Sequence, residues 1–82
     1  MYLHLGGDYL VKTSDIIGVF DLDTSTVSKV TRDFLSNAEK NKIIVYTSTE
    51  LPKSFVVCND KIYISQLSTS TLNKRIRNFK RI

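Results

Sequence analysis

The side chains that could carry out catalysis in this chain are few and isolated. His4 and Cys58 are the only histidine and the only cysteine among 82 residues. His4 could act as a general base, but it occupies a strand pattern where an outward polar residue is expected. Cys58 could act as a nucleophile if cationic neighbours lowered its pKa. It ends the apolar run 55–57, however, which predicts a buried structural thiol. The sequence therefore does not predict an enzyme.

Two further patterns, a pair of acids and a pair of glycines, have simple structural explanations. Asp21 and Asp23 could bind a divalent cation, but helix entry and N-capping account for them more simply. Gly6-Gly7 lacks the further glycine and the following helix of a phosphate-binding loop. The pair predicts a hairpin turn instead, because glycine accepts positive φ angles. A structural zinc site needs four soft or imidazole ligands, so we expect no metal and no cofactor.

The clearest chemical signal is a cluster of positive charge near the C-terminus. Lys and Arg total 12 against 8 Asp and Glu, which gives a net charge of +4. The last ten residues hold five of these bases and no acid, whereas the other 72 carry seven bases and eight acids. Such an asymmetry favours a polyanionic partner, because phosphate contacts dominate nucleic-acid affinity. The candidate phosphate contacts are Lys74, Arg75, Arg77, Lys80 and Arg81.

Two other roles for this cluster stay open, a solvated helix face and an anionic membrane surface. Leu72, Ile76 and Phe79 are spaced by four and three residues, which predicts the inward stripe of an amphipathic helix. A stripe used by the domain core is not free for lipid, so the membrane is disfavoured. The four tyrosines lie in predicted strands and are not interleaved with the cluster, as a single-strand stacking platform would require.

The elements that must position this helix follow from the hydrophobic pattern. A first helix is expected over 25–41, with N-cap oxygens at 23–25. A second, basic helix is expected over about 69–82, capped by hydroxyls at 68–70. Short strands are expected over 2–5, 9–13, 15–21, 43–46, 54–58 and 61–65.

The apolar residues of these elements predict how they pack. The stripe of the first helix comprises Val27, Val30, Phe34, Leu35 and Ala38. The runs 43–46 and 55–57 are almost continuously apolar, which predicts burial on both faces or at a subunit contact. We therefore expect an α+β fold, a small single domain over 1–82. It would contain five or six short, mostly antiparallel strands and two helices.

The chain length also bears on assembly and location. A domain of this size buries only roughly 60% of its unfolded surface, and small folds often gain stability from disulfides, a metal or self-association. A single cysteine cannot form an intrachain disulfide, so a homo-oligomer is predicted. The longest nearly apolar stretch, 16–20, is far shorter than the ~20 residues of a membrane span. With no signal-peptide pattern, we expect no membrane partner and a cytoplasmic location.

Several segments carry a resemblance that composition could not reveal. They read Tyr2-Leu3-His4-Leu5-Gly6, then DIIGVFD over 15–21, PKSFVV over 52–57 and IYISQLSTSTL over 62–72. In this order and spacing, up to about Arg75, the chain resembles the RemB branch of the RemA/RemB family of bacterial extracellular-matrix regulators. The resemblance implies an activator of biofilm-matrix gene transcription that forms oligomeric rings on double-stranded DNA. It also implies a fold related to LytTR-type DNA-binding domains.

One loop departs from the pattern of the RemA-type relatives, which carry consecutive DNA-contacting arginines before the penultimate strand. Here residues 48–53 read Ser-Thr-Glu-Leu-Pro-Lys, so Glu50 and Leu51 replace the arginines and only Lys53 is cationic. We therefore expect DNA contact through the C-terminal helix with Lys53 in support. The alternative is an oligomeric regulator or scaffold that acts through a protein partner without direct DNA binding. Salt dependence separates the two, because phosphate binding weakens steeply with ionic strength.

Overall fold

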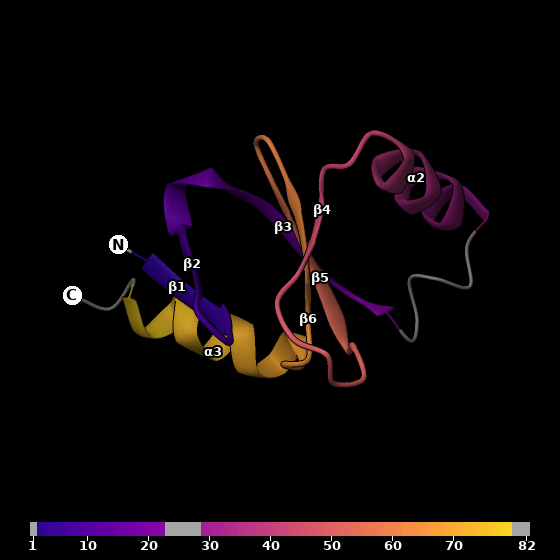
Figure 1. The fold of residues 1–82 in the computed structure, drawn as a ribbon. Helices are drawn as coiled ribbons and strands as arrows, with labels where there is room; N and C mark the ends of the chain where they lie inside the picture. The colour runs from indigo at the N-terminus through magenta and orange to yellow at the C-terminus, as the bar shows by residue number, and fades with distance from the viewer. Residues whose placement is uncertain (1, 23–28, 80–82) are drawn as a thin grey trace.

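The structure is a computed structural model that describes residues 2–22 and 29–79. Within these ranges it contains six strands in two sheets and two α-helices (Figure 1). This confirms the predicted α+β class with mostly antiparallel strands. The elements in chain order are β1 (Tyr2–Gly6), β2 (Tyr9–Lys12), the 3-10 turn η1 (Thr13–Asp15), β3 (Ile16–Asp21), α2 (Lys29–Lys40), β4 (Ile44–Tyr46), β5 (Ser54–Cys58), β6 (Ile62–Ser65) and α3 (Thr69–Phe79).

The glycine pair lies at the turn of the antiparallel β1–β2 hairpin, as the sequence predicts: Gly6 ends β1 and Gly7 begins the turn. Gly6 and Gly7 have φ angles of +113° and +55°, which residues other than glycine rarely adopt. A Cβ atom on Gly7 would lie 2.6 Å from the carbonyl oxygen of Thr47. The turn therefore packs directly on the backbone that follows β4, and glycine is needed there for space as well as for conformation.

The second sheet has the strand order β3-β5-β6-β4. β5 pairs antiparallel with both β3 and β6, while β4 pairs parallel with β6. It follows that β3, β6 and β4 run in one direction and β5 runs in the other. The edge strands of this sheet, β3 and β4, are therefore parallel in direction although they do not touch.

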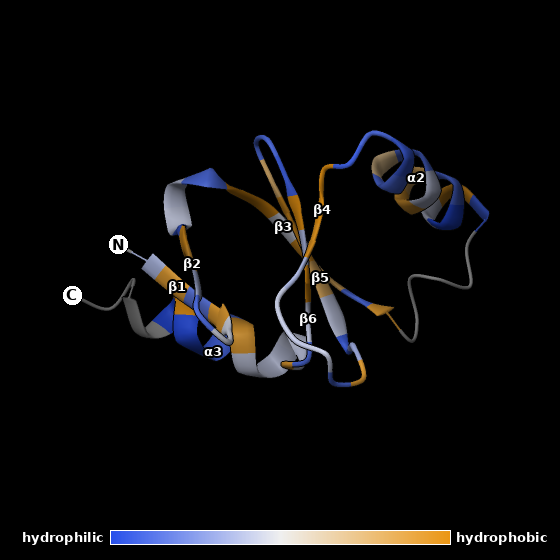
Figure 2. Ribbon diagram, viewed as in Figure 1, coloured by the Kyte–Doolittle hydropathy of each residue, from blue (hydrophilic) through white to orange (hydrophobic). Residues whose placement is uncertain are grey.

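The two faces of this sheet cover two hydrophobic clusters (Figures 1 and 2). In β5, Val56 and Cys58 face the hairpin and α3, whereas Phe55 and Val57 face α2. Phe55 and Val56 are 3% and 0% exposed, which confirms the predicted burial of this run on both faces. The first cluster contains Leu3, Leu5, Val11, Val56, Cys58 and Leu72, and the second contains Ala38, Phe55, Ile62 and Ile64.

Helix α2 packs on the sheet through only part of its apolar surface. Ala38 is buried and Leu35 packs against the second cluster, but Val30 and Phe34 are 77% and 46% exposed. The predicted apolar stripe is therefore only partly buried, because Val30 and Phe34 do not pack into the core. The apolar residues span a wide arc of the helix, and the sheet meets only one flank of that arc. Val27 and the predicted cap at 23–25 lie outside the described residues.

The C-terminal end of α2 closes with a Schellman motif, in which two bonds join the turn to the helix. Ile43 N–H donates to the Ala38 carbonyl at 3.1 Å, and Lys42 N–H donates to the Glu39 carbonyl at 3.1 Å. Lys42 has the left-handed φ of 59° that glycine usually supplies at this position. The motif turns the chain sharply into β4 and places Ile43 against the second cluster.

Candidate nucleic-acid interface

Helix α3 begins at the serine and threonine hydroxyls that the sequence indicates. The Ser68 Oγ accepts a hydrogen bond from the Thr71 N–H at 3.2 Å, which satisfies one of the unpaired amides of the first turn. Leu72 is fully buried and Ile76 packs against the same cluster, so this part of the predicted inward stripe is confirmed. The side chain of Phe79 lies outside the described residues.

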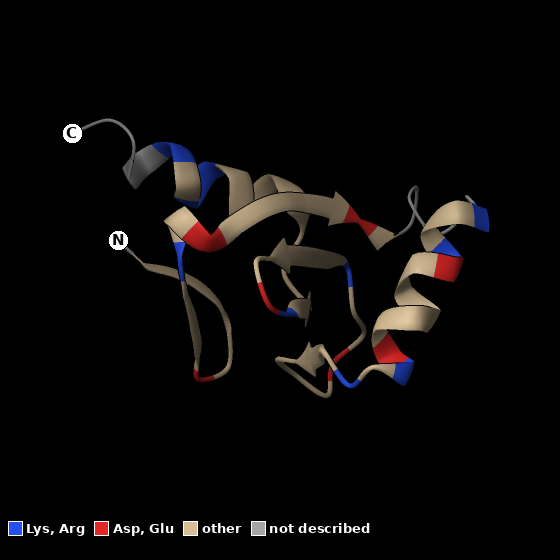
Figure 3. Ribbon diagram, turned by 90° about the horizontal axis from the view of Figure 1, so that it is seen from above, with Lys and Arg blue, Asp and Glu red and all other residues tan. Residues whose placement is uncertain are grey.

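The burial of Leu72 and Ile76 turns the basic residues of α3 outward. Lys74 and Arg77 are exposed, and together with Arg75 they lie between the middle of α3 and its C-terminal end; Figure 3 shows the basic segments of this helix in blue. Arg75 is only half-exposed, because its Nη1 donates a 2.9 Å hydrogen bond to the carbonyl oxygen of His4 in β1. Arg75 therefore joins the helix to the hairpin, while Lys74 and Arg77 have their charged groups in solvent.

The other predicted phosphate contacts have different positions. Lys80 and Arg81 lie outside the described residues. Lys53 is exposed, and its N–H donates to the Ser65 carbonyl at 2.9 Å, near the point where the chain enters α3. A helix rises about 1.5 Å per residue. The backbone positions of Lys74 and Arg77 are therefore roughly 8 and 12 Å along the helix axis from the first residue of α3. The structure thus brings Lys74, Arg75 and Arg77 together and sets Lys53 apart from them along the helix axis.

Buried hydroxyls fix the start of α3 against the hairpin and the sheet. The Ser65 Oγ donates to the Leu5 carbonyl at 2.6 Å and accepts from the Leu67 N–H at 3.0 Å. The Ser54 Oγ donates to the Leu67 carbonyl at 2.7 Å. Ser54 and Ser65 are 0% exposed. These hydroxyls satisfy buried backbone groups of the hairpin and of the segment that enters α3, and so they help to set the direction of the basic helix.

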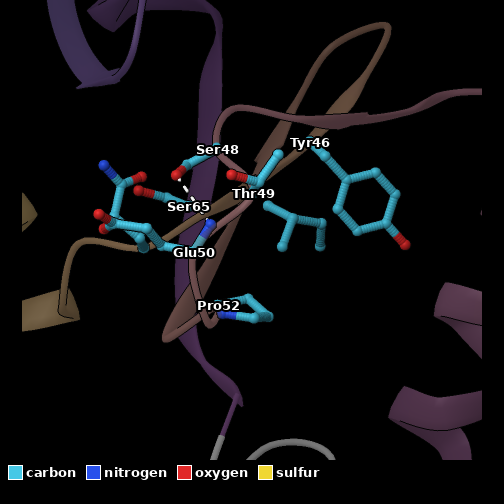
Figure 4. A pocket seen from close by; sticks show the side chains of 8 residues that line it. Tyr46, Ser48, Thr49, Glu50, Pro52 and Ser65 are labelled. Atoms are coloured by element: carbon cyan, nitrogen blue, oxygen red, sulfur yellow. Dashed lines mark hydrogen bonds between the residues drawn. The ribbon is translucent and has the colours of Figure 1, made fainter.

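The loop between β4 and β5, residues 47–53, has a chemical character opposite to that of α3. The Glu50 N–H donates to the Ser48 Oγ at 3.0 Å, and the loop borders a cavity of about 430 Å³ (Figure 4). Leu51 is 81% exposed and Tyr46, at the end of β4, is 59% exposed. An acid and two large apolar side chains are poor partners for phosphate and suit contact with protein.

The surroundings of His4 and Cys58, the candidate catalytic residues, are those of residues with structural roles. The His4 Nε2 lies 2.7 Å from the Gly7 carbonyl oxygen, so an N–H there donates across the hairpin turn. Cys58 is buried, as predicted, and burial, with smaller contributions from Asp60 and Asp15, raises the pKa of its thiol to about 11. A thiol with that pKa is protonated at neutral pH and is a poor nucleophile. Asp21 ends β3, and Asp23 lies outside the described residues.

Residues 2–22 and 29–79 contain no group of three or more His, Cys, Asp or Glu side chains placed to hold a metal ion. In the same ranges neither helix combines the length and hydropathy that crossing a membrane requires.

The sequence did not predict an apolar groove between β3 and α2, called here the β3–α2 groove. Its volume is about 280 Å³, and its rim includes Ile17 and Phe20, which are 68% and 43% exposed. Val30 and Phe34 of α2 line it from the other side. The sequence does contain one signal for this groove. The apolar residues of α2 cover a wider arc of the helix than a single narrow contact with the sheet needs.

Comparison with known proteins identifies the family to which the chain belongs. The model of the RemA-like family, described as extracellular matrix regulatory protein A-like, matches residues 2–76. The chain therefore belongs to this family of regulatory proteins.

Within the family, the chain is similar to the protein named Extracellular matrix regulatory protein B of Bacillus subtilis (strain 168). The two are 44% identical over 75 residues, which cover 92% of this chain and 89% of that protein. The match supports the RemB branch that the sequence segments indicate. The relation to LytTR-type domains stays a prediction.

Proposed function

We propose that this protein regulates the expression of extracellular-matrix (biofilm) genes as an oligomer that associates with DNA through helix α3. The match to Extracellular matrix regulatory protein B supports the regulatory role. The outward position of Lys74 and Arg77, on a helix whose opposite side is buried through Leu72, supports α3 as the DNA contact.

The size of the charge cluster sets the strength of this contact. Each phosphate that is neutralised adds about 0.9 to the slope of log affinity against log salt. Five cations from one chain therefore give a slope of at most about 4 to 5. A single α3 is then a weak site, and a ring or other oligomer repeats the site and gains affinity through avidity. A cytoplasmic location, where DNA is accessible, is part of the same proposal.

The test is fluorescence anisotropy of labelled duplex DNA across a salt series. Lys74→Glu with Arg77→Glu reverses two exposed charges and leaves the Arg75 bond to His4 in place. Lys40→Glu with Lys61→Glu is the matched control, because it makes the same change in net charge at exposed residues outside α3. The α3 variant should lose most of its binding and the control little. Equal losses would show that only net charge matters, and no binding at low salt would exclude direct DNA contact.

A second candidate function is regulation through a protein partner without direct DNA binding. The replacement of arginines by Glu50 and Leu51 and the exposure of Leu51 favour it. Binding of that kind depends on apolar contact, so it weakens little as ionic strength rises. An absence of DNA binding, combined with salt-resistant assembly, would support this candidate over the first.

A further inference from the structure

Helix α3 carries a neutral amide side chain among the cations of its outward side. Asn73, Lys74 and Arg77 are all exposed. Each residue of an α-helix is rotated by about 100° from the one before it, so these three positions fall within an arc of about 100° that is turned away from the buried side. No hydrogen bond or ion pair joins the three side chains to other described residues. Their polar groups are therefore available to an external partner.

The surroundings of α3 leave this arc open. Thr69–Phe79 contains no acid, and Figures 1 and 3 show the helix at the periphery of the molecule. A cavity of about 450 Å³ lies between α3 and η1, lined by Asn73 and Ile76 from the helix and by Thr13 and Ser14 from η1. Because of this cavity, η1 does not cover Asn73. A helix is about 10–12 Å in diameter, so it fits the major groove of B-DNA, which is about 12 Å wide.

The backbone of α3 is held in place on both sides of Asn73. Leu72, the preceding residue, is 0% exposed, and Nη1 of Arg75 donates to the His4 carbonyl at 2.9 Å. An asparagine side chain is short, so it recognises a partner precisely only where the backbone that carries it is fixed. The position of Asn73 meets this requirement.

The chemistry of an amide differs from that of the neighbouring cations. Lysine and arginine only donate hydrogen bonds, whereas an asparagine amide donates through its nitrogen and accepts through its oxygen. In the major groove, adenine presents the acceptor N7 beside the donor N6, and asparagine can pair with both at once. In the minor groove, A·T and T·A pairs present only acceptors, which an amide does not distinguish. Asn73 therefore matches the major-groove edge of adenine, whereas Lys74 and Arg77 match phosphates.

We infer that α3 enters the major groove of DNA and that Asn73 reads one adenine there through N6 and N7. Lys74 and Arg77, whose side chains are longer, reach the phosphates that border the groove. The inference rests on the DNA association in the proposed function and adds a sequence preference to it. Asn73 is then a specificity-determining residue, while the cations of α3 supply most of the affinity.

The test starts from a library of duplex DNA with a random central segment, from which the full chain selects the duplexes that it binds. The selected duplexes should share one fixed A·T pair. Fluorescence anisotropy then compares a selected duplex with the same duplex carrying another base pair at that position, and the affinity should fall roughly 5- to 150-fold. Replacing this adenine by 7-deazaadenine, which lacks the N7 acceptor, should lower the affinity roughly 2- to 10-fold, because it removes one of the two hydrogen bonds.

Two variants of α3 separate the reading of the base from the attraction to phosphate. Asn73→Ala should bind the selected and the substituted duplex equally and keep the wild-type salt dependence, because no charge changes. Lys74→Gln should weaken binding to all duplexes by a similar factor, lower the salt slope by about 0.9 and keep the adenine preference. Asn37→Ala, at an exposed asparagine of α2, is the matched control for Asn73→Ala and should keep the preference. Alanine favours the helix, so both asparagine variants should keep the wild-type circular dichroism spectrum.

The possible failures separate this inference from the function it rests on. Salt-sensitive binding with equal affinity for all duplexes would overturn the reading of adenine and leave α3 as a phosphate contact. A sequence preference that persists in Asn73→Ala, or that is insensitive to 7-deazaadenine, would also overturn it. An absence of DNA binding at low salt would overturn both the inference and the direct DNA contact of the proposed function.

Discussion

The two faces of the four-stranded sheet are covered to different extents. On one face, α3 and the hairpin bury Leu72 and Val56 completely, and serine hydroxyls satisfy the backbone at the junction. On the other face, α2 covers the sheet through Leu35 and Ala38 and leaves Val30 and Phe34 in solvent. The difference teaches that the chain itself closes the first face of the sheet, while on the second face it leaves apolar side chains exposed.

The largest expected effect comes from truncating the most buried side chain of α3. Leu72→Ala should lower the free energy of unfolding by about 2–5 kcal/mol, because it removes buried contacts and leaves a cavity. Val30→Ala on α2 should change it by less than about 0.5 kcal/mol in dilute protein. Urea denaturation measures both. Similar losses in the two variants would contradict the contrast between the faces.

The buried hydroxyl junction should come next. Ser65→Ala leaves the Leu5 carbonyl and the Leu67 N–H without this partner, which should cost about 1–3 kcal/mol of unfolding free energy. Ser36→Ala, at an exposed position of α2, is the control and should be neutral or slightly stabilising, because alanine favours the helix. A neutral Ser65→Ala result would mean that water replaces the hydroxyl.

The raised pKa of Cys58 predicts a loss of stability in alkali. The thiol has a pKa of about 11 when folded and 9.0 in the unfolded reference, so in this window the unfolded chain has lost the proton and the folded chain keeps it. Stability should therefore fall as the pH rises from 9 toward 11, by about 1–2 kcal/mol after allowance for partial solvation. Denaturation of wild type and Cys58→Ala across this range measures the difference, and identical slopes would rule the effect out.

The smallest effect is expected at the end of α2. Lys42→Gly should stabilise the protein by about 0.5 kcal/mol, because glycine adopts the left-handed φ without steric cost but loses more entropy on folding. Asn41→Gly, one residue earlier and without a positive φ, should destabilise it instead. Thermal unfolding of the two variants shows directly whether each substitution raises or lowers the stability of the protein.

The sequence predicted the α3 side better than the α2 side for a physical reason. The stripe of α3 is narrow and its start is marked by the hydroxyls at 68–70, so Leu72 and Ile76 have one consistent orientation. The apolar arc of α2 is broad, and the part that meets the sheet depends on where the rest of the chain places the helix. Helical spacing therefore places Val30 and Phe34 on the same stripe as Leu35 and Ala38, although tertiary packing leaves them exposed.

The arrangement of the candidate DNA site was only partly predictable. Composition located the basic cluster, because charge is a local property of the sequence. The hydrogen bond from Arg75 to the His4 carbonyl joins residues 71 positions apart, and no local sequence pattern predicts it. The parallel pairing of β4 with β6 is equally hidden, since strand direction is set by the path of the connecting loop.

The Leu5 carbonyl, which accepts the Ser65 hydroxyl across 60 residues of sequence, has a consequence for how the chain folds. Together with the bond from Arg75 to His4, it makes the N-terminal hairpin dependent on residues synthesised much later. Contacts between such distant segments require a large loop to close first, so folding should be slow for a domain of this size. During synthesis the hairpin must wait for residues 65–76, and the cationic face of α3 takes its orientation only when the whole domain forms in one cooperative step.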